Sequence, residues 1–184
     1  MKRLIDMVLS LTALVLLLPI LVIAALAICI DSGLPIFFKQ TRVGVGGCLF
    51  GMYKFRSMRR DAEATGTYYT QDNDERITKV GQFIRRTSID ELPQLINVLL
   101  GDMSLVGPRP DVPAQRELYS TDEWQQRCSV RPGITGLAQA LIRSVGTHQD
   151  RLALDLRYTR EHNAWLDIKI MWLTVGRLNG KGGN

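Results

Sequence analysis

The sequence predicts a mostly helical α+β domain that follows one N-terminal membrane helix. Three observations lead to this fold class. Residues 7–30 form an uncharged, strongly apolar run of 24 residues. Two β-like segments, 36–43 and 49–56, flank a glycine-rich turn and indicate a small hairpin. Apolar residues recur at helical spacing in the later segments 77–86, 90–100, 117–128, 149–163 and 164–175. A length of 184 residues suits one such domain.

The composition narrows the class of partner. The chain has 23 Lys and Arg against 18 Asp and Glu, a formal net charge of +5, which favours phosphates, nucleic acid or a lipid surface as partners. Its three cysteines are far apart and odd in number, which excludes a disulfide scaffold and fits a reducing compartment. The two histidines, His148 and His162, have no partner at ligand spacing, so a histidine-based zinc enzyme is not expected.

The apolar run at 7–30 is long enough to cross a membrane. As a straight helix it measures about 36 Å, against a hydrocarbon core of roughly 30 Å. It exceeds an ordinary signal-peptide core and leads directly into a folded segment, so cleavage is not expected. Pro19, however, divides it into halves of about 18 Å, each too short to cross. Lys2 and Arg3 precede the run, and Lys39 and Arg42 follow it, which favours placing both ends in the cytoplasm. A spanning helix and a re-entrant helix both remain open.

Two of the later segments need comment. The turn Gly44-Val45-Gly46-Gly47 lacks the dinucleotide-binding spacing and stands in no βαβ pattern, which excludes a Rossmann domain. Segment 164–175 mixes Trp165 and Trp172 with aliphatic and charged residues. It suits either a membrane interface or a helix packed on the core.

The densest cluster of chemically active side chains is the segment 85–94. Asp90 and Glu91 lie beside Arg85 at a predicted helix start. One interpretation is structural, because Asp90 as N-cap places Pro93 harmlessly at the third helical position, and Ser88 as N-cap forms a capping box with Glu91. The other is chemical. A helix N-terminus with nearby arginines attracts phosphate, and a carboxylate there can hold Mg²⁺ or attack phosphorus.

Arg109 is the second candidate for phosphate binding. Pro108 and Pro110 fix the backbone on both sides, which lowers the entropy lost when the side chain grips an anion. Other basic residues extend this inventory: Lys54, Arg56, Arg131 and Arg143. Singly, each is a typical surface charge. With the membrane run, they indicate a site for a phosphorylated molecule at a bilayer surface.

Several long blocks, in order along nearly the whole chain, resemble the bacterial sugar transferases, the small monotopic phosphoglycosyl transferases that act on polyprenol phosphate. The blocks are Lys2-Arg3 with Asp6, Gly33-Leu34-Pro35, Phe38-Lys39-Gln40, Arg42-Val43-Gly44, Tyr53-Lys54-Phe55-Arg56-Ser57-Met58, the segments 85–99, 101–110 and 131–139, and the residues Asp155, Tyr158, Asp167, Ile170 and Thr174. So many ordered blocks make the resemblance highly specific.

The resemblance implies a reaction. Such enzymes transfer a sugar 1-phosphate from a UDP-sugar to polyprenol (undecaprenol) phosphate and release UMP, the first membrane step of glycan assembly. Asp90 is then expected to attack the β-phosphorus and form a phosphosugar-aspartyl intermediate. Glu91 is expected to assist through Mg²⁺ or proton handling, with Asp90 close to the Mg²⁺. Lys54, Arg85, Arg109 and Arg143 match the family's cationic positions.

The resemblance also implies a topology. The family's short form has a re-entrant helix, so we expect a re-entrant membrane helix at 1–31, with Pro19 as its break. A cytoplasmic catalytic domain with an interfacial C-terminal helix is expected at 32–184, on the bacterial inner membrane. No nucleic-acid partner is expected, and the rival hypothesis is a non-catalytic anchored module. The sequence indicates neither the oligomeric state nor the sugar.

Two departures from the family pattern stand out. Leu18 replaces a serine that often precedes the membrane proline, so the bend depends on Pro19 alone. Residues 140–144 read Ala-Leu-Ile-Arg-Ser where the family commonly has Val-Ser-Gly-Arg-Asn, which suggests a differently shaped substrate pocket.

Overall fold

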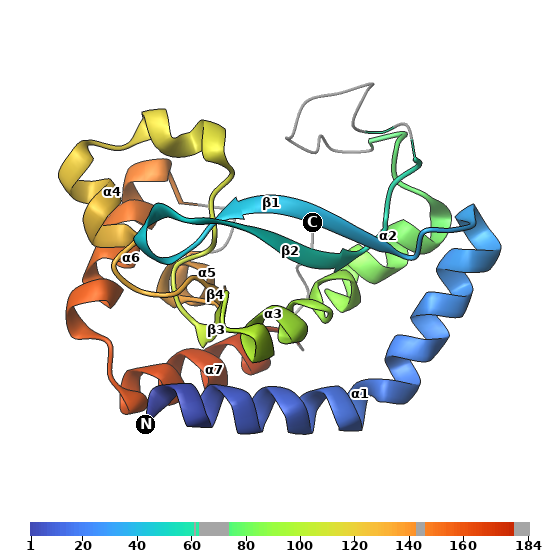
Figure 1. Cartoon of the computed structure of the whole chain (residues 1–184), viewed down its shortest axis with the longest axis horizontal. Helices are drawn as coiled ribbons and strands as arrows, with labels where there is room; N and C mark the ends of the chain where they lie inside the picture. The colour runs from blue at the N-terminus through green and yellow to red at the C-terminus, as the bar shows by residue number, and fades with distance from the viewer. Residues whose placement is uncertain (61, 63–73, 143–145, 179–184) are drawn as a thin grey trace.

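Helix α1, Lys2–Ser32, is bent into two limbs that follow two sides of the molecule (Figure 1). The structure is a computed structural model that describes residues 1–60, 62, 74–142 and 146–178. Its elements after α1 are β1 (Phe37–Val43), β2 (Leu49–Phe55), α2 (Lys79–Arg86), α3 (Gln94–Leu100), β3 (Ser104–Val106), α4 (Thr121–Arg127), β4 (Gly133–Thr135), α5 (Leu137–Leu141), α6 (His148–Glu161) and α7 (Ala164–Leu178), with short 3-10 helices at Val45–Gly47, Ile89–Glu91 and Pro113–Leu118. The predicted class, mostly helical with a small strand set and a long apolar N-terminal helix, is confirmed.

Pro19 lies inside α1 and accounts for the bend, because it lacks an N–H and its ring clashes with the preceding turn. The bend forms although Leu18 stands before the proline. Most apolar side chains of α1 are exposed, as for Val15 (64%), Leu16 (73%) and Ile23 (66%). The helix is long and apolar enough to cross a membrane by length and composition. Its surface is therefore suited to lipid.

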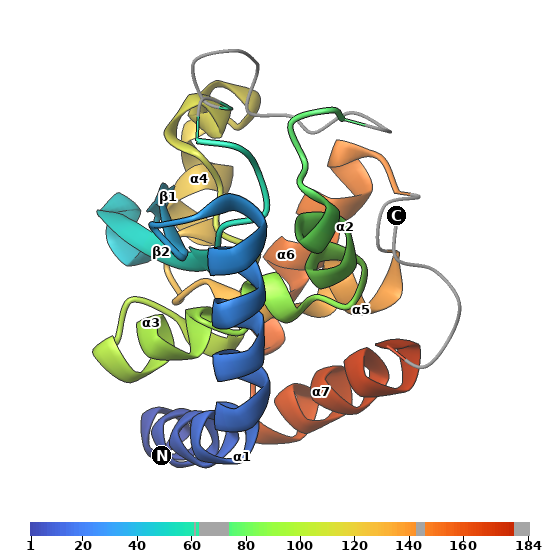
Figure 2. The same cartoon turned by 90° about the vertical axis from the view of Figure 1, so that its right-hand side faces the viewer.

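Both limbs of α1 pack on the same domain (Figures 1 and 2). In the second limb, Ala24 and Ile28 are buried against Phe55 of β2 and Ile84 of α2. In the first limb, Arg3 donates to the carbonyl oxygen of Leu99 at 2.8 Å and to that of Val98, at the end of α3. The two ends of α1 are thus fastened to one body.

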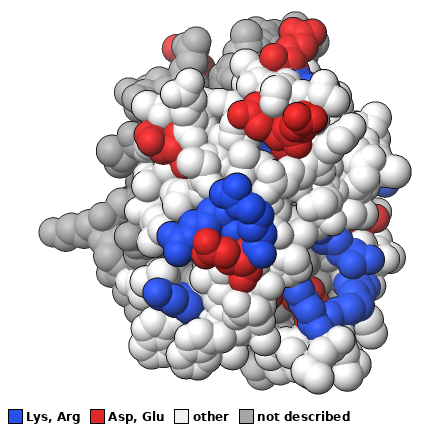
Figure 3. Space-filling view, turned by 90° about the vertical axis from the view of Figure 1, so that its left-hand side faces the viewer, with Lys and Arg blue, Asp and Glu red and all other residues white. Residues whose placement is uncertain are grey.

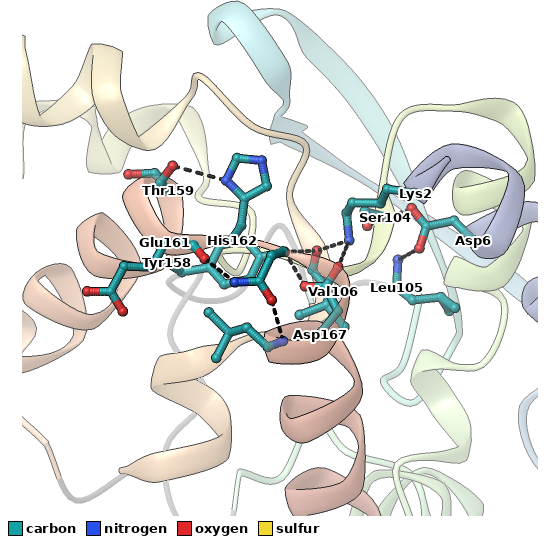
Figure 4. A network of polar contacts seen from close by, with 12 residues as sticks. Lys2, Asp6, Ser104, Leu105, Val106, Tyr158, Thr159, Glu161, His162 and Asp167 are labelled. Carbon is teal, nitrogen blue, oxygen red and sulfur yellow. Dashed lines mark hydrogen bonds and ion pairs between the residues drawn. The ribbon is translucent and has the colours of Figure 1, made fainter.

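A polar network holds the beginning of α1 (Figure 4). Lys2 Nζ lies 2.5 Å from Asp167 Oδ2 on α7. The Tyr158 hydroxyl donates to Asp167 Oδ1 at 2.7 Å and to the carbonyl oxygen of Val106 at 2.9 Å. The buried carboxylate of Asp6 accepts from Ser104 Oγ at 2.8 Å. Charged residues at the start of this apolar helix are therefore bonded to groups of the domain.

The predicted hairpin is confirmed. β1 and β2 pair antiparallel, from Phe37 opposite Phe55 to Val43 opposite Leu49. The turn between them places Gly46 and Gly47 at φ 68° and 80°, a left-handed conformation that glycine adopts without the steric cost of a Cβ. The hairpin carries Lys54 near the end of its second strand.

Asn97 joins α3 to the hairpin. Its side chain is fully buried, accepts from the Tyr53 amide at 2.9 Å and donates to the Gly51 carbonyl at 2.8 Å, so it continues the hydrogen bonding of β2 beyond its outer edge. It also donates to Asp102 Oδ2 at 3.1 Å. Since β2 carries Lys54 and α3 follows Asp90, this one amide fixes the relative position of the two segments.

Helix α7 confirms one of the two interpretations of segment 164–175, a helix packed on the core, and leaves another face of the helix exposed. Ile170 is fully buried in a core with Val106, Leu137 and Tyr158. Trp165 and Trp172, seven residues apart and so on one face, are 76% and 78% exposed. This exposed aromatic face is suited to a membrane interface.

We predict that Asn97→Leu destabilises the domain, because it leaves the Tyr53 amide and the Gly51 carbonyl without a buried partner. The expected loss is about 2–4 kcal/mol, seen as a lower thermal unfolding temperature of the detergent-purified protein. Gln149→Leu, at an exposed position of α6, serves as the comparison. An Asn97→Leu protein that unfolds at the wild-type temperature would contradict this role.

Candidate active site

The centre of the site is the carboxylate of Glu91. Its Oε1 accepts from Lys54 Nζ at 3.0 Å and from Arg109 Nη2 at 2.7 Å. These three residues come from the hairpin, from the turn before α3 and from the loop after β3. One carboxylate oxygen therefore assembles segments that are far apart in sequence, and it places two cations beside Asp90.

The backbone before α3 explains why both acids are available. Ser88 has φ 58°, the only left-handed residue other than glycine in the described chain, and it redirects the backbone after α2. Asp90 and Glu91 follow in a 3-10 turn, and α3 begins only at Gln94, with Pro93 as its N-cap. The predicted helix at 90–100 is therefore split. Neither Ser88 nor Pro93 makes a side-chain cap bond, so the structure does not support the capping interpretation.

Asp90 is buried yet unbonded. Its side chain makes no hydrogen bond or ion pair with any residue in the described part of the chain, although the residue is only 8% exposed. Burial raises its pKa to about 6, and Glu91 adds to this, while Lys54, Arg85 and Arg109 act in the opposite direction. Above pH 6, Asp90 is thus an ionised carboxylate whose lone pairs are unbonded and which is partly shielded from water.

Glu91 has the opposite electrostatic environment. Burial favours its neutral form, but Arg109 and Lys54 outweigh burial and hold its pKa well below the usual range. Burial lowers the pKa of Lys54, and Glu91 limits that effect. Two neighbouring acids thus have divergent pKa values, which is typical of carboxylates with different chemical tasks.

The backbone around Arg109 is held by two arginines. Arg127 Nη2 donates to the Arg109 carbonyl at 2.6 Å, while the same guanidinium pairs with Asp155 at 3.0 Å and with Asp111. Arg42 Nη1 donates to the Pro110 carbonyl at 2.8 Å. The rigidity that the two prolines predicted thus has further support from these buried ion pairs.

The structure separates the basic residues predicted for this site. Lys54 and Arg109 are at its centre, and Arg85 is among the charges that act on Asp90. Arg56 lies elsewhere. Its Nη2 donates to Ser32 O and Oγ at 2.8 and 2.9 Å and to Gly33 O, so it caps the end of α1.

The remaining two predicted residues do not join the cluster. Arg131 Nε donates to the Gly101 carbonyl at 2.8 Å, so it caps the end of α3. Arg143 lies outside the described residues. The positions of Arg56 and Arg131 have one physical cause: the carbonyl oxygens at helix C-termini lack partners within the helix and attract guanidinium groups as phosphates do.

Sequence reasoning missed four residues that shape the site: Arg42, Gln94, Asn97 and Arg127. Arg42 and Asn97 occur in blocks that carry the family resemblance, but no charge pattern distinguishes them from surface residues. Arg127 reads as an ordinary charge in a helical segment. Only the fold shows that its guanidinium is buried between two aspartates.

The described residues contain no group of three or more side chains able to enclose a metal ion. The two carboxylates of Asp90 and Glu91 still fit an Mg²⁺ ion that is shared with a substrate, because Mg²⁺ commonly binds through one or two carboxylates and phosphate oxygens. Asp90 offers an unbonded carboxylate. Glu91 Oε1 is already occupied by two cations, which leaves its second oxygen.

Figure 3 shows the charges on one face of the surface. The Lys and Arg side chains there lie beside Asp and Glu side chains and form no continuous basic patch. On α6, the exposed residues Arg157 and Glu161 form an ion pair of 2.8 Å.

Residues 1–180 match the bacterial sugar transferase family. The chain belongs to this family. It is 43% identical over 184 residues to the UDP-glucose:undecaprenyl-phosphate glucose-1-phosphate transferase of Caulobacter vibrioides, covering 96% of this chain and 69% of that protein. It is 45% identical over 183 residues to the protein of the same name from Escherichia coli, covering 95% of this chain and 39% of the relative. The family and the enzyme class predicted from the sequence are confirmed.

The relatives differ in length. An exopolysaccharide production protein of Rhizobium leguminosarum is 44% identical over 188 residues, which cover 95% of this chain and 93% of that protein. The chain spans well under half of several other relatives, including 39% of the Escherichia coli protein. In each of the three relatives named here, the match covers at least 95% of this chain.

We predict that Asp90→Asn stabilises the fold at pH 8. The pKa of Asp90 is about 6 in the folded protein and has the ordinary value of 3.8 in the unfolded chain. At a pH above both pKa values, ionisation of Asp90 therefore lowers the free energy of unfolding by about 3 kcal/mol. The penalty falls as the pH drops through 6 and is absent below about 4. Thermal unfolding of both proteins across this range measures it. Asp122→Asn, at an exposed position of α4, is the control, and an Asp90→Asn protein no more stable than wild type at pH 8 would refute the assignment.

Proposed function

We propose that this chain transfers a sugar 1-phosphate from a UDP-sugar to polyprenol phosphate at the cytoplasmic face of the bacterial inner membrane. The observation that carries the proposal is the buried, unbonded Asp90 beside a Glu91 that holds two cations. The names of the relatives support the substrate classes, since they refer to UDP-glucose and undecaprenyl phosphate.

The reaction has two steps. An Asp90 carboxylate oxygen attacks the β-phosphorus of the UDP-sugar, the bond from that phosphorus to the bridging oxygen breaks, and UMP leaves with the electron pair. A phosphate oxygen of the lipid then attacks the same phosphorus, and the Asp90 carboxylate leaves. Neither step requires a general base, because both nucleophiles are already anionic.

The cations have a defined task in this scheme. Lys54 and Arg109 face a phosphoryl group at Asp90 and neutralise the charge on its oxygens. Their positions are set in advance by Glu91, so little reorganisation accompanies the reaction. Because its pKa is held low, Glu91 stays ionised and is unsuited to proton handling, and we assign it to positioning these cations.

Mg²⁺ completes the proposal. Asp90 would hold it together with the diphosphate, and the ion would supply charge neutralisation and orientation of the leaving UMP. Glu91 contributes at most its second oxygen.

The first test concerns the intermediate. With UDP-sugar and Mg²⁺ but no lipid, wild-type protein is expected to release one UMP and gain the mass of one sugar phosphate on Asp90. Asp90→Asn is expected to lose transfer by at least about 1,000-fold while remaining folded, because its amide is a poor nucleophile. Asp122→Asn should behave as wild type. Transfer in wild-type protein without any adduct would point to direct displacement, and no UMP release at all would point to a non-catalytic module.

The second test concerns the membrane. We propose that α1 enters and leaves on one side, because Lys2, Arg3 and Asp6 and the other end of α1 all contact the same domain. A cysteine at Leu4, in a variant whose Cys29 and Cys48 are serine, should react with an impermeant label only from the cytoplasmic side. The native Cys48, exposed in the hairpin turn, reports the domain's side when Cys29 alone is replaced. Labelling of position 4 from the periplasm would contradict the re-entrant path.

A further inference from the structure

Gln94 carries a buried donor that no described residue satisfies. Among the described residues, four buried side-chain atoms lack a hydrogen-bond partner: Ser10 Oγ, Arg56 Nε, Arg56 Nη1 and Gln94 Nε2. The first three lie on or against α1. Gln94 is the one in the segment that carries Asp90, and it is only 2% exposed. A buried amide N–H without an acceptor is costly, so its retention needs a reason.

The backbone places this amide on the same side as Asp90. Of the three residues between them, Glu91 ends the 3-10 turn, and Leu92 and Pro93 have helical dihedral angles, φ −57° with ψ −34° and φ −61° with ψ −16°. Residues four apart along a helical path lie on neighbouring positions of one face. Asp90, Gln94 and Asn97 are 8%, 2% and 0% exposed and form a buried polar row. Asn97 is fully bonded at the inner end of this row, and Asp90 is free at the outer end.

The surroundings define the chemistry of the missing acceptor. Lys54, Arg85 and Arg109 act on Asp90 from the same site, so cations outnumber the two carboxylates there. Such a site draws an anion, and Nε2 can only donate. A phosphoryl group has three outer oxygens that accept hydrogen bonds, and the Gln94 amide offers one N–H donor besides the cations of the site.

We propose that Gln94 Nε2 donates to a non-bridging oxygen of the phosphoryl group that Asp90 receives. The inference rests on the proposed function and adds a substrate contact to it. Because the same phosphoryl group is attacked in both steps, the hydrogen bond acts in both. Gln94 Nε2 then stabilises the charge on the phosphoryl oxygens. As a donor, it binds neither a proton nor Mg²⁺.

The decisive variant is Gln94→Met, which keeps the shape and removes the donor. A structural residue loses stability on such a change, whereas a buried donor that waits for a substrate does not. We expect Gln94→Met to unfold at or above the wild-type temperature, and to slow both half-reactions about 10- to 100-fold in single turnover. The two rates are UMP release with UDP-sugar alone and discharge of the trapped intermediate by polyprenol phosphate.

Two control variants test whether the effect is specific to Gln94. Gln149→Met, at an exposed position of α6, should change neither stability nor rate. Gln126 Nε2 donates to Thr159 Oγ1 at 3.1 Å and to Leu156 O at 3.3 Å, so Gln126→Met should lower the unfolding temperature as the loss of a satisfied amide does.

A second variant covers the case in which Gln94→Met folds poorly. Gln94→Glu puts a negative charge beside Asp90, so it should raise the Asp90 pKa and move the acid limb of the pH–rate profile to higher pH. A shifted limb places the side chain of residue 94 beside the reacting carboxylate, and an unshifted limb places it elsewhere.

The outcomes separate the two proposals. Wild-type rates in Gln94→Met, an effect confined to the lipid step, or loss of stability together with an unshifted pH profile in Gln94→Glu would each overturn the Gln94 assignment while the transferase function stands. If wild-type protein releases no UMP, the proposed function fails. The Gln94 contact is then judged by binding alone: UDP-sugar should raise the unfolding temperature of Asp90→Asn more than that of the Asp90→Asn, Gln94→Met double variant, and equal shifts would overturn it.

Discussion

The ion pairs of Glu91 are the interaction on which the rest of the site depends. A single oxygen accepts from Lys54 on the hairpin and from Arg109 on the loop after β3, so the position of two cations is set by an acid that takes no proton. Much of the remaining structure fixes the positions of those three segments relative to one another. Asn97 ties β2 to α3, while Arg42 and Arg127 hold the backbone on which Arg109 is carried. The cations are thus fixed before any substrate arrives, which is the condition for electrostatic catalysis.

The membrane helix is part of this same framework. Arg3 bonds the carbonyl oxygens that end α3, and α3 begins four residues after Asp90. Arg56 bonds the end of α1 and lies two residues after Lys54 on the chain. Each end of α1 is therefore linked through one arginine to a segment that carries a residue of the site. The geometry of the site thus depends on how α1 packs against the domain.

The sequence was sufficient for features that depend on local chemistry. Glycines with positive φ specify the hairpin turn, and Pro19 specifies the bend of α1. It was insufficient where a residue's partner comes from a distant segment. The parallel pair of β3 and β4 is three residues long on each side, too short for any periodic pattern. Arg56, Arg109 and Arg131 all read as phosphate-binding candidates, because charge is visible in a sequence and the direction of a guanidinium is not.

The start of α3 shows why the two acids were ambiguous. Asp90 and Glu91 stand where capping residues stand, but the left-handed Ser88 and the 3-10 turn move the helix start to Gln94. The acids are thereby released from the backbone, one to hold cations and one to remain unbonded. An aspartate that caps a helix has its lone pairs engaged and its pKa lowered, which makes a poor nucleophile. The Asp90 carboxylate instead has no hydrogen-bond partner among the described residues, and the buried Gln94 Nε2, one turn later, has none either. Two such groups are hard to explain by stability, but they are what a site complementary to a phosphoryl group requires before that group has bound.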